Sequence, residues 1–164
     1  GATIYAEVSG YGSTCDAYHV TAPEPEAAHI ARAIQLALGN QTDIPADRIY
    51  INTHGTGTPL NDVTETKAIK RAFGHKAKEL HISSTKSMTG HMLGAAGAAE
   101  AIAAILALQH GTVPPTINLQ EPDEACDLNY TPGTPVKADL ELALSTSLGF
   151  GGHNACVAFQ KVKE

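Results

Sequence analysis

Aromatic residues and cysteines are scarce in this sequence. Tryptophan is absent from its 164 residues, and Phe, Trp and Tyr together account for 5%. Cys15, Cys126 and Cys156 are an odd number of cysteines at wide spacings, without a CxxC pair or a zinc-like Cys/His arrangement. This argues against a disulfide-stapled secreted scaffold and against a structural zinc site. We therefore expect reduced thiols and no bound metal.

Basic residues are also fewer than acidic ones. Lys and Arg number 11 against 17 Asp and Glu, which gives a formal net charge of −6 at pH 7. Because nucleic-acid binding needs a basic surface, we expect no nucleic-acid partner. The first residues lack a signal-sequence pattern, and the most apolar stretch, Met92–Leu108, contains Glu100 and is short for a membrane span. We expect no membrane partner and a cytoplasmic location, or the plastid stroma if a transit peptide has been removed.

The hydrophobic residues that are present alternate between strand-like and helix-like segments. Five segments have strand patterns: residues 3–11, 49–52, 80–83, 142–147 and 155–160. Three have helical periodicity: one that ends at Gly39, one from Pro59 to Gly74, and one from Gly90 to His110. The third is nearly all small or apolar, so we expect it to be buried on most sides. Residues 111–140, rich in Pro, Asp, Glu and Asn, form a long excursion.

The resulting order, β-α-β-α-β-α-β-β, predicts a single α/β domain over residues 1–164. Alternation of this kind favours a mostly parallel five-stranded sheet with helices on both faces, a three-layer α/β/α arrangement. The short last connection predicts an antiparallel final strand. Sites in such sheets form at the carboxyl ends of strands. Three candidate segments follow strands there: His54–Pro59, Ser83–His91 and Gly149–His153.

The first candidate segment is His54-Gly-Thr-Gly-Thr-Pro59. A histidine directly after a strand, followed by two glycines, places an imidazole at a sharp corner, and Thr56 and Thr58 add two hydroxyls. The alternative is a plain strand-to-helix turn, with Thr58 as N-cap and Pro59 at the first helical position. The segment is not a P-loop, because the lysine and its spacing are missing.

The second segment combines Lys86, which follows a strand, with His91, which is expected to open the third helix. A helix N-terminus disfavours positive charge, so a neutral His91 could donate an N–H to a developing oxyanion. Glu100 lies within the same apolar helix, and a buried carboxylate needs a partner, for which Lys86 or His91 is the candidate. The alternatives are a structural histidine and a solvent-facing Glu100.

The third segment is the glycine-rich turn Gly149-Phe150-Gly151-Gly152. Three glycines around one aromatic residue permit unusual backbone angles and could bring a backbone N–H to a site. The alternative is an ordinary hairpin turn.

Together and in this order, these segments resemble the C-terminal half of a β-ketoacyl-acyl-carrier-protein synthase of type II, a thiolase-fold condensing enzyme of fatty-acid synthesis. The resemblance covers essentially the whole chain. It rests on His54–Pro59 with Asp62, Ser83–Gly97 and Gly149–Gly152, with further similarity at Asp16–Pro23 and Asn118–Tyr130. It implies a thiolase-like half and decarboxylative condensation of malonyl-carrier protein with an acyl-enzyme thioester.

The resemblance also assigns roles to the residues that match. His54 and His91 would hydrogen-bond the malonyl thioester oxygen and stabilise the enolate, with Lys86 shaping the electrostatics and Glu100 holding it. Thr56 and Thr58 would contact the phosphopantetheine arm.

Two further assignments concern the surroundings of these groups. Asp62 and Glu65 would orient the loop and helix that carry the first histidine. Phe150 would gate the acyl pocket, and its N–H would form one arm of an oxyanion hole.

The resemblance further implies substrates carried on the phosphopantetheine of an acyl carrier protein, with no other cofactor. Its expected partners are that carrier protein, an N-terminal half absent from this chain, and a second copy in the full-length homodimer. The family's nucleophilic cysteine lies on that other half, and none of the three cysteines here has its strand-to-helix elbow. We therefore expect the chain to be inactive alone.

Two alternatives stay open. A non-catalytic chain-length-factor-like domain is disfavoured by intact His54, Lys86 and His91. Part of a polyketide ketosynthase is disfavoured by the Lys-Ser-Met-Thr-Gly-His sequence at 86–91.

Overall fold

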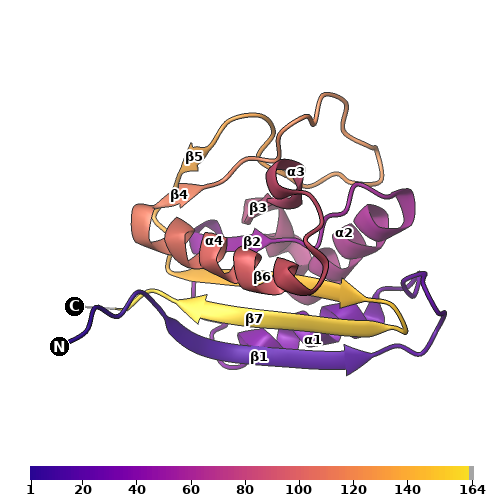
Figure 1. Cartoon of the computed structure of the whole chain (residues 1–164), viewed down its shortest axis with the longest axis horizontal. Coiled ribbons are helices and arrows are strands. Elements are labelled where there is room, and N and C mark those ends of the chain that lie inside the picture. The colour runs from indigo at the N-terminus through magenta and orange to yellow at the C-terminus, as the bar shows by residue number, and fades with distance from the viewer. Residues whose placement is uncertain (163–164) are drawn as a thin grey trace.

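A five-stranded mixed sheet forms the centre of the computed structural model, which describes residues 1–162 (Figure 1). Its strands lie in the order β1-β7-β6-β2-β3, and β7 runs in the direction opposite to the other four. This confirms the predicted mixed sheet with an antiparallel last strand. The strand bounds are β1 (Glu7–Cys15), β2 (Ile49–Asn52), β3 (His81–Ser83), β6 (Leu142–Gly149) and β7 (His153–Gln160).

Helices cover both faces of this sheet, as the alternating pattern predicts. α1 (Ala28–Leu38) and α2 (Pro59–Phe73) lie on one face, and α4 (Ala96–His110) lies on the other (Figure 1). The short elements are η1 (Ala46–Arg48), η2 (Gly74–Glu79), α3 (Lys86–Thr89) and η3 (Leu93–Ala95). A two-stranded ribbon, β4 (Thr112–Val113) with β5 (Val136–Lys137), closes the base of the excursion.

The core is divided by the sheet, because successive residues of a strand point to opposite faces. Ile51 packs with Ile34 and Ile69 on the α1/α2 side, while the neighbouring Tyr50 packs with Leu108 on the α4 side. The α1/α2 cluster is the larger of the two and includes side chains from four of the five sheet strands. The α4 cluster is smaller and joins Ala104, Ala107 and Leu108 of the helix to strand and loop residues such as Leu140 and Phe159.

β1 starts later than the pattern predicts. The expected strand over residues 3–11 is wrong by several residues, because pairing with β7 runs from Glu7 opposite Gln160 to Cys15 opposite His153. Its glycines permit a close approach of α1: a β-carbon at Gly12 would lie 1.9 Å from the carbonyl oxygen of Ala33. β1 is an edge strand, and its register shifts between Val8 and Gly10.

α4 differs from its prediction in length and in burial. It begins at Ala96 rather than Gly90, because Gly90 and Leu93 have positive φ angles that interrupt a helix. Its outer face is apolar but exposed: Ile102 is 59% and Leu106 45% accessible. The expectation of burial on most sides is therefore wrong, since within residues 1–162 the helix packs its inner face on the sheet and the ribbon beside it.

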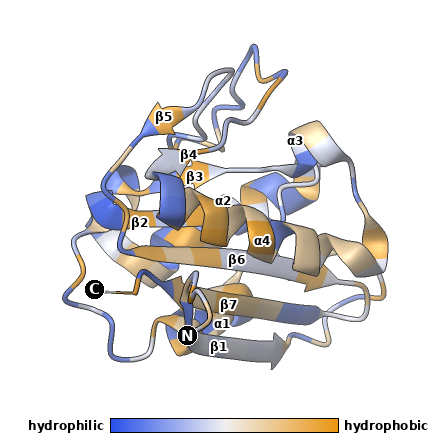
Figure 2. Cartoon of the chain, turned by 60° about the vertical axis from the view of Figure 1, so that its left-hand side comes forward, coloured by the Kyte–Doolittle hydropathy of each residue, from blue (hydrophilic) through white to orange (hydrophobic). Residues whose placement is uncertain are grey.

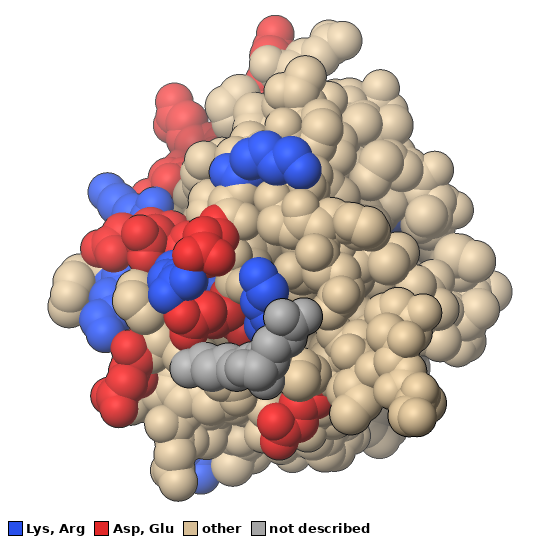
Figure 3. All heavy atoms as spheres, turned by 90° about the vertical axis from the view of Figure 1, so that its left-hand side faces the viewer, with Lys and Arg blue, Asp and Glu red and all other residues tan. Residues whose placement is uncertain are grey.

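The outer face of α4 belongs to a broad surface with little charge. The side that faces the viewer in Figure 1 lies on the right in Figure 3, where few Lys, Arg, Asp or Glu side chains appear. Figure 2 shows hydrophobic residues along α4 on the same side. By length and composition alone Leu93–His110 could cross a membrane, and apolar core helices of soluble proteins pass the same test.

Candidate active site

Three loops meet at the carboxyl edge of the sheet. β2, β3 and β6 are parallel, so the residues that follow Asn52, Ser83 and Gly149 lie at the same edge. His54 follows β2, Lys86 follows β3 at the start of α3, and Phe150 follows β6. The structure therefore brings all three predicted segments to one end of the molecule.

His54 is anchored through its backbone. Its N–H lies 2.8 Å from Glu65 Oε1 and 3.0 Å from Thr146 Oγ1, and the N–H of Gly55 donates to Glu65 Oε2 at 2.9 Å. Glu65 is only 2% exposed, and burial raises the pKa of its carboxyl while these hydrogen bonds act in the opposite direction. α2 therefore fixes the position of the residue that leaves β2.

The His54 ring is buried and uncharged. His54 is 7% exposed, and burial, Lys86 and His91 together lower its pKa from 6.5 to about 3. Nδ1 is buried without a hydrogen-bond partner among the described residues. A neutral imidazole at this position can offer an N–H to an oxyanion without carrying a charge into the core.

His91 reaches the same place from an exposed loop. It lies before η3 and α4 rather than at the start of a helix, so the predicted helix N-terminal setting is wrong. The N–H of Leu93 donates to His91 Nδ1 at 3.1 Å, and Leu93 adopts a positive φ of 50°. Because Nδ1 accepts, a neutral His91 carries its proton on Nε2.

The two imidazoles stand edge to face. Their ring centroids are 5.3 Å apart with an interplanar angle of 83°. Residues far apart in sequence thus bring two imidazole rings side by side, and neighbouring N–H donors are the kind of group that can stabilise a developing oxygen anion.

Lys86 and Glu100 form a buried ion pair near the histidines. Lys86 Nζ donates to Glu100 Oε1, and the two side chains are 4% and 3% exposed. This confirms that Lys86, rather than His91, is the partner of Glu100. Burial raises the pKa of Glu100, and Lys86 opposes that shift. The ammonium adds positive potential near His54 and contributes to keeping that ring neutral.

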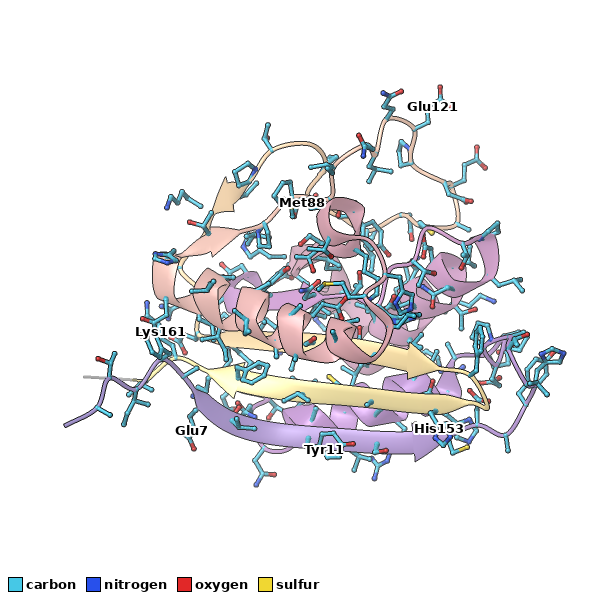
Figure 4. All side chains as sticks on the ribbon, viewed as in Figure 1. Glu7, Tyr11, Met88, Glu121, His153 and Lys161 are labelled. Atoms are coloured by element: carbon cyan, nitrogen blue, oxygen red, sulfur yellow. The ribbon has the colours of Figure 1, made fainter. Side chains whose placement is uncertain are left out.

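Thr56 and Thr58 line a cavity of about 720 Å³ beside His91. Their hydroxyls are 2.9 Å apart, and Asp62 Oδ1 accepts the N–H of Gly57 between them at 3.3 Å. Thr58 is at the N-cap position of α2 and Pro59 is its first residue, as the turn alternative predicts, but the Thr58 side chain makes no capping hydrogen bond. The role of Thr56 and Thr58 in substrate binding stays a prediction. The cavity continues toward the excursion, where its lining includes Asn118, Cys126 and Tyr130. Glu121, labelled on the excursion in Figure 4, also lines it.

Phe150 occupies the turn between β6 and β7 and is 76% exposed. It does not line the cavity. Gly151 and Gly152 both have φ of 82°, and a β-carbon at Gly152 would lie 2.4 Å from Asp16 Oδ1. The turn is thus packed against the Asp16–Val20 loop, where the N–H of Gly151 donates to the Val20 carbonyl at 2.7 Å. Its gating and oxyanion roles stay predictions.

Several participants carried no sequence signal strong enough to be found. Thr146 lies within a strand that has no distinctive motif, and Asn52 and Thr85 form a buried pair of hydrogen bonds between β2 and the loop after β3.

The three cysteines are dispersed. Cys15 is exposed, Cys156 is buried in β7, and Cys126 lines the cavity wall, where burial raises its pKa. In residues 1–162, no cluster of three or more His, Cys, Asp or Glu is placed to hold a metal ion.

Comparison with known proteins gives consistent matches. Residues 5–120 match the family described as "Beta-ketoacyl synthase, C-terminal domain". The 3-oxoacyl-[acyl-carrier-protein] synthase 2 of Synechocystis sp. is 54% identical over 161 residues, which cover 98% of this chain and 39% of that protein. The synthase 2 of Staphylococcus aureus is 52% identical with the same coverage. The chain therefore spans about two fifths of the length of these curated relatives.

Solved structures show the same fold. A chain from the complex of a type II polyketide acyl-carrier protein with its ketosynthase, bound to the hexaketide, has a TM-score of 0.94 at 41% identity, over 99% of this chain and 40% of that one. A β-ketoacyl synthase from Burkholderia phymatum has a TM-score of 0.89 at 42% identity, over 99% and 39%.

Proposed function

This chain belongs to the β-ketoacyl synthase family, whose C-terminal domain it carries, and we propose that it supplies the decarboxylating side of a 3-oxoacyl-[acyl-carrier-protein] synthase active site. The observation that carries the proposal is the edge-to-face pair His54–His91 near the buried Lys86–Glu100 ion pair. Since a whole synthase is longer than this chain, the nucleophilic cysteine and the rest of the site would come from a further segment of the same enzyme.

In the proposed reaction a malonyl group, held as a thioester on an acyl carrier protein, loses CO2. The C–C bond to the carboxylate breaks, and its electron pair forms an enolate whose negative charge rests on the thioester oxygen. N–H groups of His54 and His91 would hydrogen-bond that oxygen as charge develops. The carbon end of the enolate then attacks the acyl thioester on the cysteine, which leaves as thiolate.

The electrostatics of the site support the role of His54 as a hydrogen-bond donor. A pKa of about 3 keeps the His54 ring neutral throughout the working pH range, so it donates a hydrogen bond instead of a proton. Thr56 and Thr58 lie on the cavity wall next to His91, where they would contact the phosphopantetheine arm. The uncharged outer face of α4 would pack against the rest of the synthase.

A chimaera tests the proposal. The matching segment of the Synechocystis synthase is replaced by this chain, and decarboxylation of malonyl-carrier protein is measured. His54→Ala and His91→Ala should each slow decarboxylation by roughly a hundredfold, the loss typical of one oxyanion donor. His75→Ala, an exposed histidine on η2, is the matched control and should act like the parent.

Two outcomes would contradict the proposal. One is a chimaera whose decarboxylation survives both histidine substitutions. The other is condensation of acyl and malonyl groups by this chain alone in a homogeneous preparation.

A second candidate is the corresponding part of a polyketide ketosynthase, favoured by the ketosynthase complex among the structural matches. The two candidates share the histidine pair, and they differ in the acyl group that the chimaera extends. Faster extension of a polyketide starter than of a saturated acyl chain would favour this second candidate.

A further inference from the structure

The hydroxyl of Thr146 lies at the junction of three elements. Thr146 is on β6 and is 1% exposed. Its Oγ1 is 2.6 Å from Glu65 Oε1 on α2 and 3.0 Å from the backbone nitrogen of His54 after β2. One buried hydroxyl therefore touches both the anchor of His54 and His54 itself.

The directions of these hydrogen bonds follow from counting protons. The N–H groups of His54 and Gly55 can only donate, and both point at the carboxylate of Glu65. The Thr146 hydroxyl has one proton, and its shortest contact is to Glu65 Oε1, so it donates there and accepts from His54 with a lone pair. The carbonyl oxygen of Asn52, at 3.5 Å, is the weaker acceptor.

We infer that Thr146 is a positioning residue for His54, which it holds at the exit of β2 both directly and by completing the hydrogen bonds of Glu65. The inference deepens the proposed function and rests on it. Since β6 continues into the Gly149–Gly152 turn, the same strand that carries this turn also sets the place of the first histidine. A displaced His54 would change its position relative to His91, whose ring centroid lies 5.3 Å from its own.

Thr146→Val tests the inference in this chain, because valine keeps the shape and removes the hydroxyl. The carboxyl carbon of Glu65 and the amide of His54 are followed by NMR as pH changes. T146V should raise the pH at which Glu65 titrates, since a donor to the charged form is lost, and should shift the His54 amide signal. Thr146→Ser should restore both. Should T146V fail to fold, Thr146→Ala removes the same donor.

Thr53→Val is the matched control. Thr53 is a buried threonine next to His54 whose hydroxyl donates to the Ser83 carbonyl at 3.2 Å instead of to Glu65. T53V should leave the Glu65 titration unchanged. A Glu65 titration that is unaltered in T146V, or equally altered in T53V, would overturn the inference.

The kinetic readout uses the chimaera. T146V should lower kcat for malonyl decarboxylation roughly tenfold with little change in KM, as expected when a catalytic group is displaced by a fraction of an ångström. T146S should recover the rate. If Glu65 responds but kcat does not, the positioning role is wrong while the proposed function stands on the His54→Ala result. If His54→Ala has no effect, the proposed function fails, and the inference fails with it.

Discussion

The two sides of the sheet differ in how completely their helices are buried, and each side contributes one histidine to the site. On the α1/α2 side the core is closed, and His54 is fixed by a fully buried carboxylate from α2. On the α4 side the helix buries one face only, and His91 stands on an exposed loop whose geometry depends on Leu93. The first histidine is therefore held by buried hydrogen bonds, whereas the second lies beside an apolar surface that the described residues leave exposed.

The largest expected effect concerns the α1/α2 side of the sheet, where Glu65 anchors His54. Glu65→Ala leaves the buried N–H groups of His54 and Gly55 without their acceptor, so the free energy of unfolding should fall by about 3 kcal/mol. Glu7→Ala, which removes an exposed carboxylate on β1, should change it by less than about 0.5 kcal/mol. Urea unfolding of both variants measures the difference. Equal midpoints would show that Glu65 does not anchor the loop.

A second effect is the dependence of stability on the protonation of His54. The unfolded chain protonates His54 near its ordinary pKa of 6.5, whereas the folded chain resists protonation until about 3. The contribution of His54 to stability is therefore full above pH 6.5 and is lost as pH falls, with a slope approaching about 1.4 kcal/mol per pH unit. By pH 5 this amounts to about 2 kcal/mol.

His54→Asn should remove this slope, whereas His75→Asn should keep it. The comparison must be made as a difference between chains, because the raised pKa of Glu65 acts with the opposite sign: its stabilisation is present at low pH and is lost as pH rises. Urea midpoints at several pH values between 7 and 5 provide the measurement. An unchanged slope in H54N would mean that His54 is protonated in the folded state.

The smallest expected effect on stability concerns the α4 side of the sheet. Ile102→Lys on the exposed face of α4 should change the free energy of unfolding by less than about 0.5 kcal/mol. It should also reduce binding of an apolar dye and self-association, because it interrupts an apolar surface. Ile34→Lys, at a fully buried position on α1, should prevent folding. A chain that binds no dye before substitution would contradict the exposed-face description.

Local sequence patterns were sufficient for much of this structure. His54, Lys86 and His91 follow strands in glycine- or polar-rich segments, and the topology of parallel strands then brings such segments together. Glu100 was recognisable because a lone carboxylate in an apolar helix needs a partner. These features depend on neighbours in sequence and on general rules of α/β sheets.

Other features depend on distant partners and could not be predicted. Thr146 lies in a strand whose sequence is unremarkable, and its partner Glu65 is 81 positions away. The composition of α4 indicates an apolar helix, but it does not show whether a second layer covers that helix. β1 was misplaced because its Gly, Ser and Thr residues have weak strand propensity, and only the pairing with β7 defines its ends.

The irregular edge of the sheet has a consequence for solubility. Among residues 1–162, β1 pairs with a strand on one side only, and Val8 and Tyr11 are exposed on it. Figure 4 labels Tyr11 on this strand. A long flat strand of this kind would template pairing with other chains and promote aggregation. The register shift between Val8 and Gly10 bends and twists the strand at that point, which shortens the straight stretch open to a second strand. The irregularity therefore disfavours edge-to-edge pairing of this strand with another chain.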